Sequence, residues 1–274
     1  MAALTDKLLV LARQGDDEAA GKVAVNNFKT TDSEWSIELA EDERVLGVAA
    51  GDGWVAAATS KNFLRLFTSH GIQREVISLV GPLVSMAGGG SKLFMATHSA
   101  HPLPDQQNFS YYVLNVDFRR GLSRLTGPAH LAVTPGSELY WVGVSDTRLP
   151  VTGDSTGMVR MLLNNAWYPI CDTKAGMTGK SDTFYLTCVD HKDLQVRGVK
   201  CSGRRYPPTF PLPSPASLPI NAPFCATGER AELEQKLLSS ALLRPLAKTD
   251  PELEADTSRK ESECLMKLFA LACR

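Results

Sequence analysis

Short apolar runs separated by turn residues follow one another from residue 8 to about residue 225. They are Leu8–Leu11, Lys22–Phe28, Trp35–Leu39, Val45–Ala50, Trp54–Thr59, Phe63–Thr68, Glu75–Val80, Leu83–Ala87, Leu93–Thr97, Tyr111–Val116, Leu139–Val144, Met158–Leu163, Trp167–Cys171, Phe184–Val189 and Leu194–Val199. Turn segments such as Gly51-Asp52-Gly53 and Thr134-Pro135-Gly136 lie between them. Many short strands without a long helical pattern between them predict an all-β domain.

The runs also group into units of four strands. One unit extends from Val45 to about Val80, a second from Leu83 to about Leu125, a third from Leu139 to about Cys171, and a fourth begins near Phe184. Unit starts recur at roughly 40 to 55 residues, close to the blade period of WD-type propellers. The spacing therefore favours a β-propeller, with a large β-sandwich as the alternative. The chain begins almost directly with a strand, and we expect the propeller to be incomplete at its N-terminus.

The unit that begins at Val45 shows the pattern most clearly. The small side chains Ala56-Ala57-Ala58 suit an inner strand close to a propeller axis. In Phe63–Phe67, aromatic residues and Arg65 alternate with leucines, as in a strand with two different faces. The triple glycine at 88–90 is interpreted as a turn, because no helix follows to form a phosphate site.

The composition changes after Tyr206, where prolines dominate. They occupy positions 207, 208, 211, 213, 215, 219 and 223. This predicts an extended strap or edge strand. The interleaved Phe210, Leu212, Leu218 and Ile220 are expected to pack against the domain. A polyproline ligand for an aromatic groove is the alternative.

Two helices are predicted at the C-terminal end. The first covers about Glu229 to Leu243 and should stop at Pro245; the second should begin at Ser258, with Glu261 completing a capping box. Its apolar stripe consists of Leu265, Leu268, Phe269 and Ala272. The stripe reaches the end of the chain, which predicts a truncated helical bundle and a fragment less stable than the complete region.

Composition limits the class of protein. The 274 residues suffice for one large domain with an appendage. The formal net charge of −1 excludes a strongly basic protein that coats nucleic acid. Apolar runs are too short for a signal peptide or a membrane span, so we expect an intracellular protein. The six cysteines form no Cys-x-x-Cys pair, which predicts reduced thiols and no zinc site.

Candidate chemistry is sparse in the sequence. Neither a nucleophile elbow nor a phosphate-binding loop occurs, and we expect no catalytic residue, metal or cofactor. The segment around Asp154 is similar to the structural turns of sialidase propellers, which leaves a propeller hydrolase as a minor alternative. Lys200, Arg204 and Arg205, beside Tyr206, are the best candidates for nucleic-acid contacts. A solvated turn would explain the same charges.

Several segments, in order, resemble a known family. They are Gly51–Ser60, Leu64–Thr68, Gly81–Gly88, Asp154–Leu162, Trp167–Cys171, Gly179–Asp182, Arg205–Thr209 and Leu265–Leu271. The chain thereby resembles the SepB propeller region of the family of chromosome transmission fidelity protein 4 and the WD-repeat and HMG-box DNA-binding protein. The resemblance covers most of residues 35 to 274. It implies a six-bladed propeller at 1–225 and the start of a helical bundle at 226–274.

The resemblance also implies a function. Members tether the replicative CMG helicase to DNA polymerase α/primase on chromatin in the nucleus, form homotrimers through their propellers, and support sister-chromatid cohesion. Some partners bind as short helices on the bundle, so Leu265, Leu268 and Phe269 are candidate partner-binding residues, although their positions favour packing in the bundle core. The alternative function is another intracellular propeller scaffold, such as a substrate receptor of a ubiquitin ligase.

Overall fold

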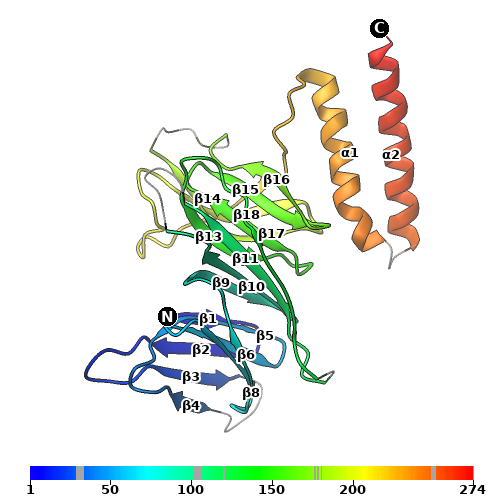
Figure 1. The fold of residues 1–274 in the computed structure, drawn as a ribbon. Helices are drawn as coiled ribbons and strands as arrows, with labels where there is room; N and C mark the ends of the chain where they lie inside the picture. The colour runs from blue at the N-terminus through cyan, green and yellow to red at the C-terminus, as the bar shows by residue number, and fades with distance from the viewer. Residues whose placement is uncertain are drawn as a thin grey trace. The chain divides into compact units, whose positions relative to one another are not determined.

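The computed structural model describes residues 1–28, 34–101, 107–119, 121–175, 177, 179, 181–247 and 251–273. Within these ranges the strands are β1 (Ala2–Leu4), β2 (Leu8–Arg13), β3 (Lys22–Asn27), β4 (Trp35–Glu38), β5 (Val45–Gly51), β6 (Trp54–Thr59), β7 (Phe63–Thr68), β8 (Gln73–Ser78), β9 (Leu83–Gly89), β10 (Lys92–His98), β11 (Phe109–Asn115), β12 (Arg124–His130), β13 (Leu139–Val144), β14 (Pro150–Asp154), β15 (Met158–Leu163), β16 (Ala166–Asp172), β17 (Thr183–Asp190), β18 (Gln195–Cys201) and β19 (Pro215–Pro219). The helices are α1 (Gly228–Ala247) and α2 (Pro251–Ala272). The expected all-β fold followed by a short helical segment is confirmed (Figure 1).

The structure divides into two compact units, Met1–Thr156 and Gly157–Arg274, which are described separately. In the first unit, consecutive strands pair into three antiparallel four-stranded sheets, β1–β4, β5–β8 and β9–β12, followed by the β13–β14 hairpin. The first strands of successive sheets lie against one another, β1 on β5, β5 on β9 and β9 on β13. Sequential four-stranded meanders that meet through their first strands have the arrangement of propeller blades.

Strand β6 explains how the sheets are held together, because all six of its residues are buried. Trp54, Ala56 and Ala58 belong to the core shared with β9–β12, whereas Val55 and Ala57 belong to the core shared with β1–β4. Side chains alternate across a strand, so one strand supplies both cores. The alternation expected for Phe63–Phe67 is confirmed, since Leu64 and Leu66 face one core and Phe67 the other.

Close contact between first strands requires glycine at two facing positions. A Cβ on Gly88 would lie 2.2 Å from the Ala50 oxygen, and a Cβ on Gly51 would lie 2.3 Å from the Gly90 oxygen. Trp54 closes this contact by donating its indole N–H to the Gly90 oxygen at 2.8 Å. The interpretation of 88–90 as a turn is therefore correct only for Gly90, which has a φ of 57°. Gly88 and Gly89 belong to β9.

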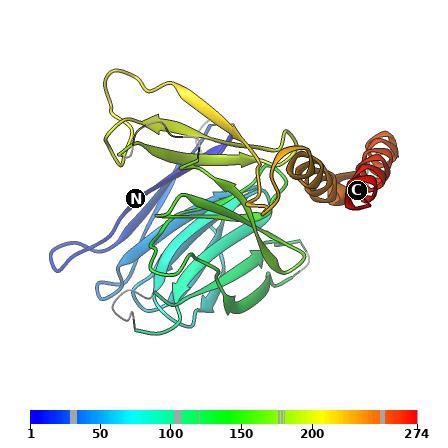
Figure 2. The ribbon, with the colours of Figure 1, turned by 90° about the horizontal axis from the view of Figure 1, so that it is seen from above.

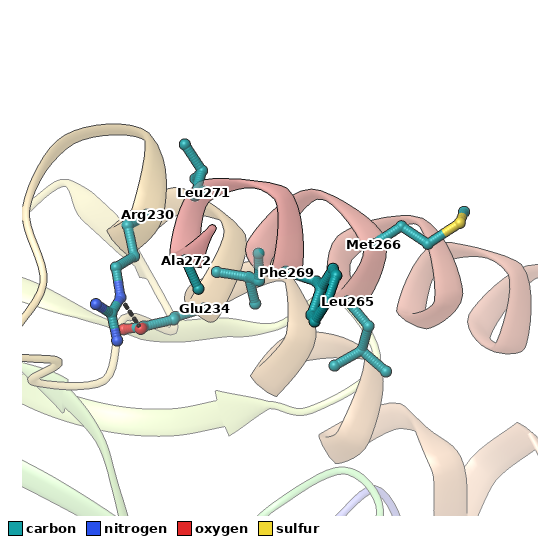
Figure 3. A pocket seen from close by; sticks show the side chains of 8 residues that line it. Arg230, Glu234, Leu265, Met266, Phe269, Leu271 and Ala272 are labelled. Carbon is teal, nitrogen blue, oxygen red and sulfur yellow. Dashed lines mark hydrogen bonds and ion pairs between the residues drawn. The ribbon is translucent and has the colours of Figure 1, made fainter. Parts of the chain in front are cut away.

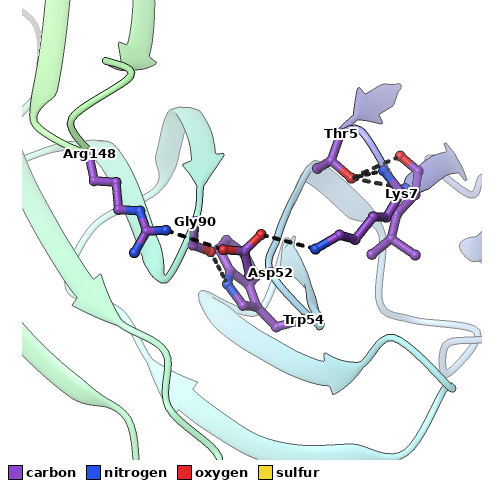
Figure 4. Close-up of polar contacts among 7 residues, drawn as sticks. Thr5, Lys7, Asp52, Trp54, Gly90 and Arg148 are labelled. Atoms are coloured by element: carbon purple, nitrogen blue, oxygen red, sulfur yellow. Dashed lines mark hydrogen bonds and ion pairs between the residues drawn. The ribbon is translucent and has the colours of Figure 1, made fainter. Parts of the chain in front are cut away.

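Charged residues join the turns at the same place. Asp52 lies between Lys7, at 3.9 Å, and Arg148, at 3.4 Å (Figure 4). The three side chains come from three different strand-connecting turns of the first unit. All three are substantially exposed, so this network adds little to stability.

The second unit combines a small sheet with the two helices. It holds the β15–β16 hairpin and the three-stranded sheet β17-β18-β19. Strand β19 is the expected proline-rich edge strand, and its terminal residues Pro215 and Pro219 have no N–H to offer another strand. Helices α1 and α2 lie side by side, as both views show (Figures 1 and 2).

Both helix boundaries differ from the prediction. Helix α1 continues through position 245 to Ala247, and its packed face continues from the buried Leu242 before the proline to the buried Ala247 after it. Helix α2 begins at Pro251, so Ser258 is an interior residue and the predicted capping box is wrong. Proline suits the first helical position, and Glu252 and Glu254 favour the positive N-terminal end of the helix.

Of the strands in the described residues, the apolar runs located fifteen; β19 was expected only as a proline-rich edge segment, and β1, β12 and β14 were missed. Strand β1 has three residues, too few for a periodic signal. Strands β12, β14 and β19 contain or begin with proline, which the pattern treats as a breaker. Because β1 was missed, the repeat was counted from Val45, although β1, β2, β3 and β4 already form a four-stranded sheet before it. The expected ring of six blades stays a prediction.

Replacing Gly88 with alanine should destabilise the chain by about 3 kcal/mol, because the new methyl group meets a backbone oxygen that has no room to move. Gly89 is the matched control. Its added Cβ would meet only the Val144 side chain, at 3.1 Å, so the cost should be about 1 kcal/mol. Urea denaturation measures both values. Equal effects of the two substitutions would contradict the proposed strand contact.

The ion pair between Glu43 and Arg65 should make stability depend on pH. Arg65 donates to both carboxylate oxygens, at 2.8 and 2.6 Å, and Glu43 is 1% exposed. These hydrogen bonds lower the pKa of Glu43. Their stabilisation is thus present above the unfolded value of about 4.3 and is lost as the pH falls through the lower folded value.

Replacing Arg65 with leucine should cost about 3 kcal/mol at pH 7, since it leaves a buried carboxylate without its partner. The deficit should shrink near pH 4, because the buried carboxyl of the variant has lost the partner that lowers its pKa and takes up a proton more readily than the paired Glu43. Arg44→Leu removes the exposed pair with Asp17 and should cost less than about 1 kcal/mol. Urea denaturation at the two pH values tests this, and a deficit independent of pH would contradict it.

Candidate interaction surfaces

Helix α2 exposes an apolar surface, which we call the α2 ridge, formed by Leu265, Met266 and Phe269. Their exposed fractions are 53%, 65% and 72%. Leu268, Leu271 and Ala272 line the same hollow, with Arg230 and Glu234 of α1 on its rim (Figure 3). Arg230 pairs with Glu234 at 2.8 Å, so this rim is polar. Exposed apolar surface with a polar rim is typical of a site that binds another apolar surface.

The helix leaves this ridge exposed because it packs through another face. Thr257, Glu261 and Cys264 are its buried residues, and Leu268 and Leu271 are half-buried. These positions recur every three or four residues and form the contact with α1. Arg244 of α1 forms an ion pair with Glu261, which allows a carboxylate to lie in this contact. The more apolar face therefore points to solvent.

Helix α1 is attached to the sheet of the second unit by polar contacts. His191, completely buried in the turn after β17, lies 2.9 Å from the Leu242 oxygen through Nε2. Gln235 donates to the Ile220 oxygen at 2.6 Å and accepts from the Ala222 N–H at 3.0 Å. These contacts attach α1 to the second unit, and α2 is attached through its packing on α1.

Of the three predicted partner-binding residues, Leu265 and Phe269 lie on the α2 ridge and Leu268 lies at its base. Leu265 and Phe269 are thus available to a partner and are not packed within the described chain. Met266 belongs to the same surface and was not predicted. The predicted stripe contains residues three or four positions apart along the helix. Met266 directly follows Leu265 and does not fit this spacing. Partner binding by these residues stays a prediction.

The predicted basic residues form a second surface. Lys200 lies in β18, next to its last residue, and Lys200 and Arg204 line a shallow groove with Phe210 and Leu212. The Arg205 guanidinium carbon lies 5.7 Å from the centre of the Tyr206 ring, which in turn meets Tyr185 edge-on at 6.2 Å. Cations and exposed aromatic rings thus lie together, as single-stranded nucleic acid requires.

The proline-rich segment carries part of this surface, and one expectation about it is wrong. Phe210 and Leu212 are 87% and 86% exposed, so they do not pack against the domain. Ile220 is buried and Leu218 is half-buried, as expected. The packing prediction holds only where the segment pairs as β19. Before β19, Phe210 and Leu212 only line a shallow groove beside the end of β18 and stay largely exposed.

Asp154, the residue on which a hydrolase would depend, is buried and accepts several hydrogen bonds. Only 1% of it is exposed, and its carboxylate accepts hydrogen bonds from the N–H and hydroxyl of Thr134 and of Thr156, at 2.5 to 3.0 Å. These bonds join two turns of the first unit. The carboxylate therefore has a structural role, in which it connects the turns that contain Thr134 and Thr156.

The remaining candidates for chemistry are the cysteines and any group of potential metal ligands. All six cysteines are free, and Cys171, Cys201 and Cys264 are buried. Burial raises the pKa of the Cys171 thiol to about 11, which keeps it protonated and unreactive at neutral pH. Within the described ranges, no group of three or more potential metal ligands occurs, and no helix is long and apolar enough to cross a membrane.

Comparison with known proteins identifies the family. The family described as "Minichromosome loss protein, Mcl1, middle region" matches residues 1–224. The chain belongs to this family. The match covers all the described strands, from β1 through β19.

Three curated relatives agree with this assignment. "WD repeat and HMG-box DNA-binding protein 1" is 36% identical in Homo sapiens and 32% identical in Xenopus laevis, over 100% of this chain. "Protein ENHANCER OF LHP1 1" of Arabidopsis thaliana is 28% identical over 89% of the chain. The chain spans about a quarter of the length of these relatives, 25%, 25% and 27% respectively. The resemblance deduced from the sequence motifs is confirmed.

The basic surface should bind single-stranded DNA in a salt-dependent manner. Replacing Arg204 and Arg205 with serine should weaken binding and reduce the slope of log affinity against log salt by about 1.4, or 0.7 for each lost phosphate contact. Arg197→Ser is the control, because Asp190 and Asp193 already neutralise that charge. Fluorescence anisotropy with a labelled oligothymidine measures the slope. Identical slopes for the two variants would remove Arg204 and Arg205 from the candidate site.

Proposed function

We propose that this chain is the propeller-and-helix adaptor region of a nuclear replisome scaffold. It links the CMG helicase to DNA polymerase α/primase on chromatin, and it thereby supports DNA replication and sister-chromatid cohesion. The membership of residues 1–224 in the Mcl1 middle-region family carries this proposal. The names of the curated relatives support a role on DNA, since they include an HMG-box DNA-binding protein.

The two described surfaces support an adaptor. The α2 ridge offers three exposed apolar side chains beside a fixed ion pair, which suits the apolar face of a short helix. Its helix is fixed through α1 to the sheet of the second unit, so a bound partner would be held at a defined position. The proposal includes assembly into a homotrimer, as the family resemblance implies.

The proposal assigns the chain no catalytic step. Its function is to bring other proteins together, which requires surfaces rather than activated groups. The four hydrogen bonds on Asp154 support this, because they leave that carboxylate committed to the turns. A substrate receptor of a ubiquitin ligase would use the same kind of surface, and the partner identity distinguishes the two functions.

Replacing Phe269 with aspartate should weaken binding of a helical peptide from DNA polymerase α by at least about tenfold, because a charge would enter the centre of the apolar contact. Phe210→Asp is the matched control, since Phe210 is also largely exposed, 87% against 72% for Phe269, and does not line the hollow beside α2. Fluorescence anisotropy with labelled peptide gives the affinities, and circular dichroism confirms that both variants are folded.

Light scattering of the parent chain complements this experiment, with a trimer as the expected species. A monomer that binds neither polymerase nor helicase peptides would overturn the proposal. Capture of a cullin adaptor in place of replication proteins would support the ubiquitin-ligase alternative. Equal losses in the two phenylalanine variants would retain the adaptor function but reject the α2 ridge as its binding site.

A further inference from the structure

The connection between β11 and β12 is fastened to the neighbouring sheet at one serine. Ser123, immediately before β12, donates its hydroxyl to Glu75 Oε1 at 2.7 Å and its backbone N–H to both carboxylate oxygens, at 3.0 and 3.2 Å. Glu75 lies in β8, one sheet earlier, and is 9% exposed. A single serine therefore supplies three hydrogen bonds to a buried carboxylate on another sheet.

The same connection has a second, apolar attachment. Phe118 packs against the core shared by β5–β8 and β9–β12, and the Arg74 guanidinium lies 5.6 Å from the centre of its ring. Phe118 thus provides the apolar part of the contact and Ser123 the polar part. Loss of the polar part would free the end next to β12 while Phe118 keeps the other end in place.

The residues around Ser123 are open to solvent. Leu122 is 83% exposed, and Arg119 and Arg124 are exposed as well. Gly121 has a φ of 100° and nothing within 4 Å of an added Cβ. Ser123 itself is half-buried. The described side chains on both sides of the serine are therefore accessible to an enzyme, and the hydroxyl and N–H bonds to Glu75 hold the serine inward.

The sequence before the serine has a recognisable charge pattern. It is Arg119-Arg120-Gly121-Leu122-Ser123, which places arginines four and three residues before the hydroxyl. Many serine/threonine kinases select substrates by charge, and an acidic groove beside the active site accepts an arginine at this distance. The chain thus combines a kinase-type charge pattern with a serine that closes a contact between two sheets.

We propose that Ser123 is a phosphorylation site for an arginine-directed serine/threonine kinase, and that phosphorylation opens its contact with Glu75. The serine oxygen attacks the γ-phosphorus of Mg-ATP, an O–P bond forms to Ser123, and the bond from the γ-phosphorus to ADP breaks. The hydroxyl proton passes to the catalytic base of the kinase. ADP is released, and no oxidant or reductant is involved.

Electrostatics gives the direction of the change. A phosphoserine carries a charge of about −1.5 to −2 at pH 7 and has lost the hydroxyl proton that bonded to Glu75. It would face a carboxylate at hydrogen-bonding distance, so the two anions repel each other. Arg119 and Arg124 offer the phosphate partners on the solvent side. The phosphorylated loop should therefore leave Glu75 and turn outward.

The test treats the purified chain with Mg-ATP and calcium/calmodulin-dependent protein kinase II, which serves as the arginine-directed probe. Mass spectrometry should find one phosphate on Ser123 in the parent chain and none at that position in Ser123→Ala. Hydrogen exchange of residues 117–125 should become about tenfold faster after phosphorylation, equivalent to about 1.4 kcal/mol. Ser123→Ala without kinase shows how much of this change comes from loss of the hydroxyl alone.

A synthetic peptide of residues 115–127 and the variant Glu75→Gln complete the experiment. In Glu75→Gln the phosphate faces a neutral amide, so the acceleration of exchange should be much smaller than in the parent chain. Failure to phosphorylate the folded chain would overturn the proposal, whether or not the peptide is a substrate. Phosphorylation without faster exchange, or an equal acceleration in Glu75→Gln, would overturn the opening of the contact.

Discussion

The close contact between the first strands of successive sheets is the constraint on which the first unit depends. A tryptophan and two glycines define it: Trp54 covers the contact and bonds to the Gly90 oxygen, while Gly51 and Gly88 leave room for the facing backbones. Once this distance is fixed, β6 is buried on both faces and must supply two cores at once. Small side chains at Ala56, Ala57 and Ala58 follow from that position, because larger ones would force the sheets apart.

Polar contacts in this structure define positions more than they add stability. The Asp52 network is exposed and connects three turns. Asp154 and Glu75 are buried, and each holds a turn or loop from elsewhere in the first unit through several hydrogen bonds. A buried carboxylate must be fully bonded to be tolerated. Such a site responds strongly to added charge, which is why a single phosphate at Ser123 could have a large local effect.

In helix α2, the buried residues are not those that the apolar periodicity of the sequence predicts. Helix α2 packs through Thr257, Glu261 and Cys264, and its most apolar side chains face solvent. The ion pair of Glu261 with Arg244 permits this arrangement, because it satisfies a charge that would otherwise oppose burial. The exposed ridge is then available for binding. An adaptor that recognises helices needs a surface of this kind, and its own core must use other residues.

The sequence by itself determined the strands with regular alternation, the two-helix ending and the family, because these depend on local pattern and on motifs in order. It also placed Lys200, Arg204 and Arg205 next to an aromatic residue. The tertiary structure decided which face of α2 is buried, that Phe210 and Leu212 stay exposed, and that Gly88 belongs to a strand. It also brought Ser123 to Glu75 across 48 residues. These outcomes depend on partners distant in sequence, and no local periodicity encodes the identity of a distant partner.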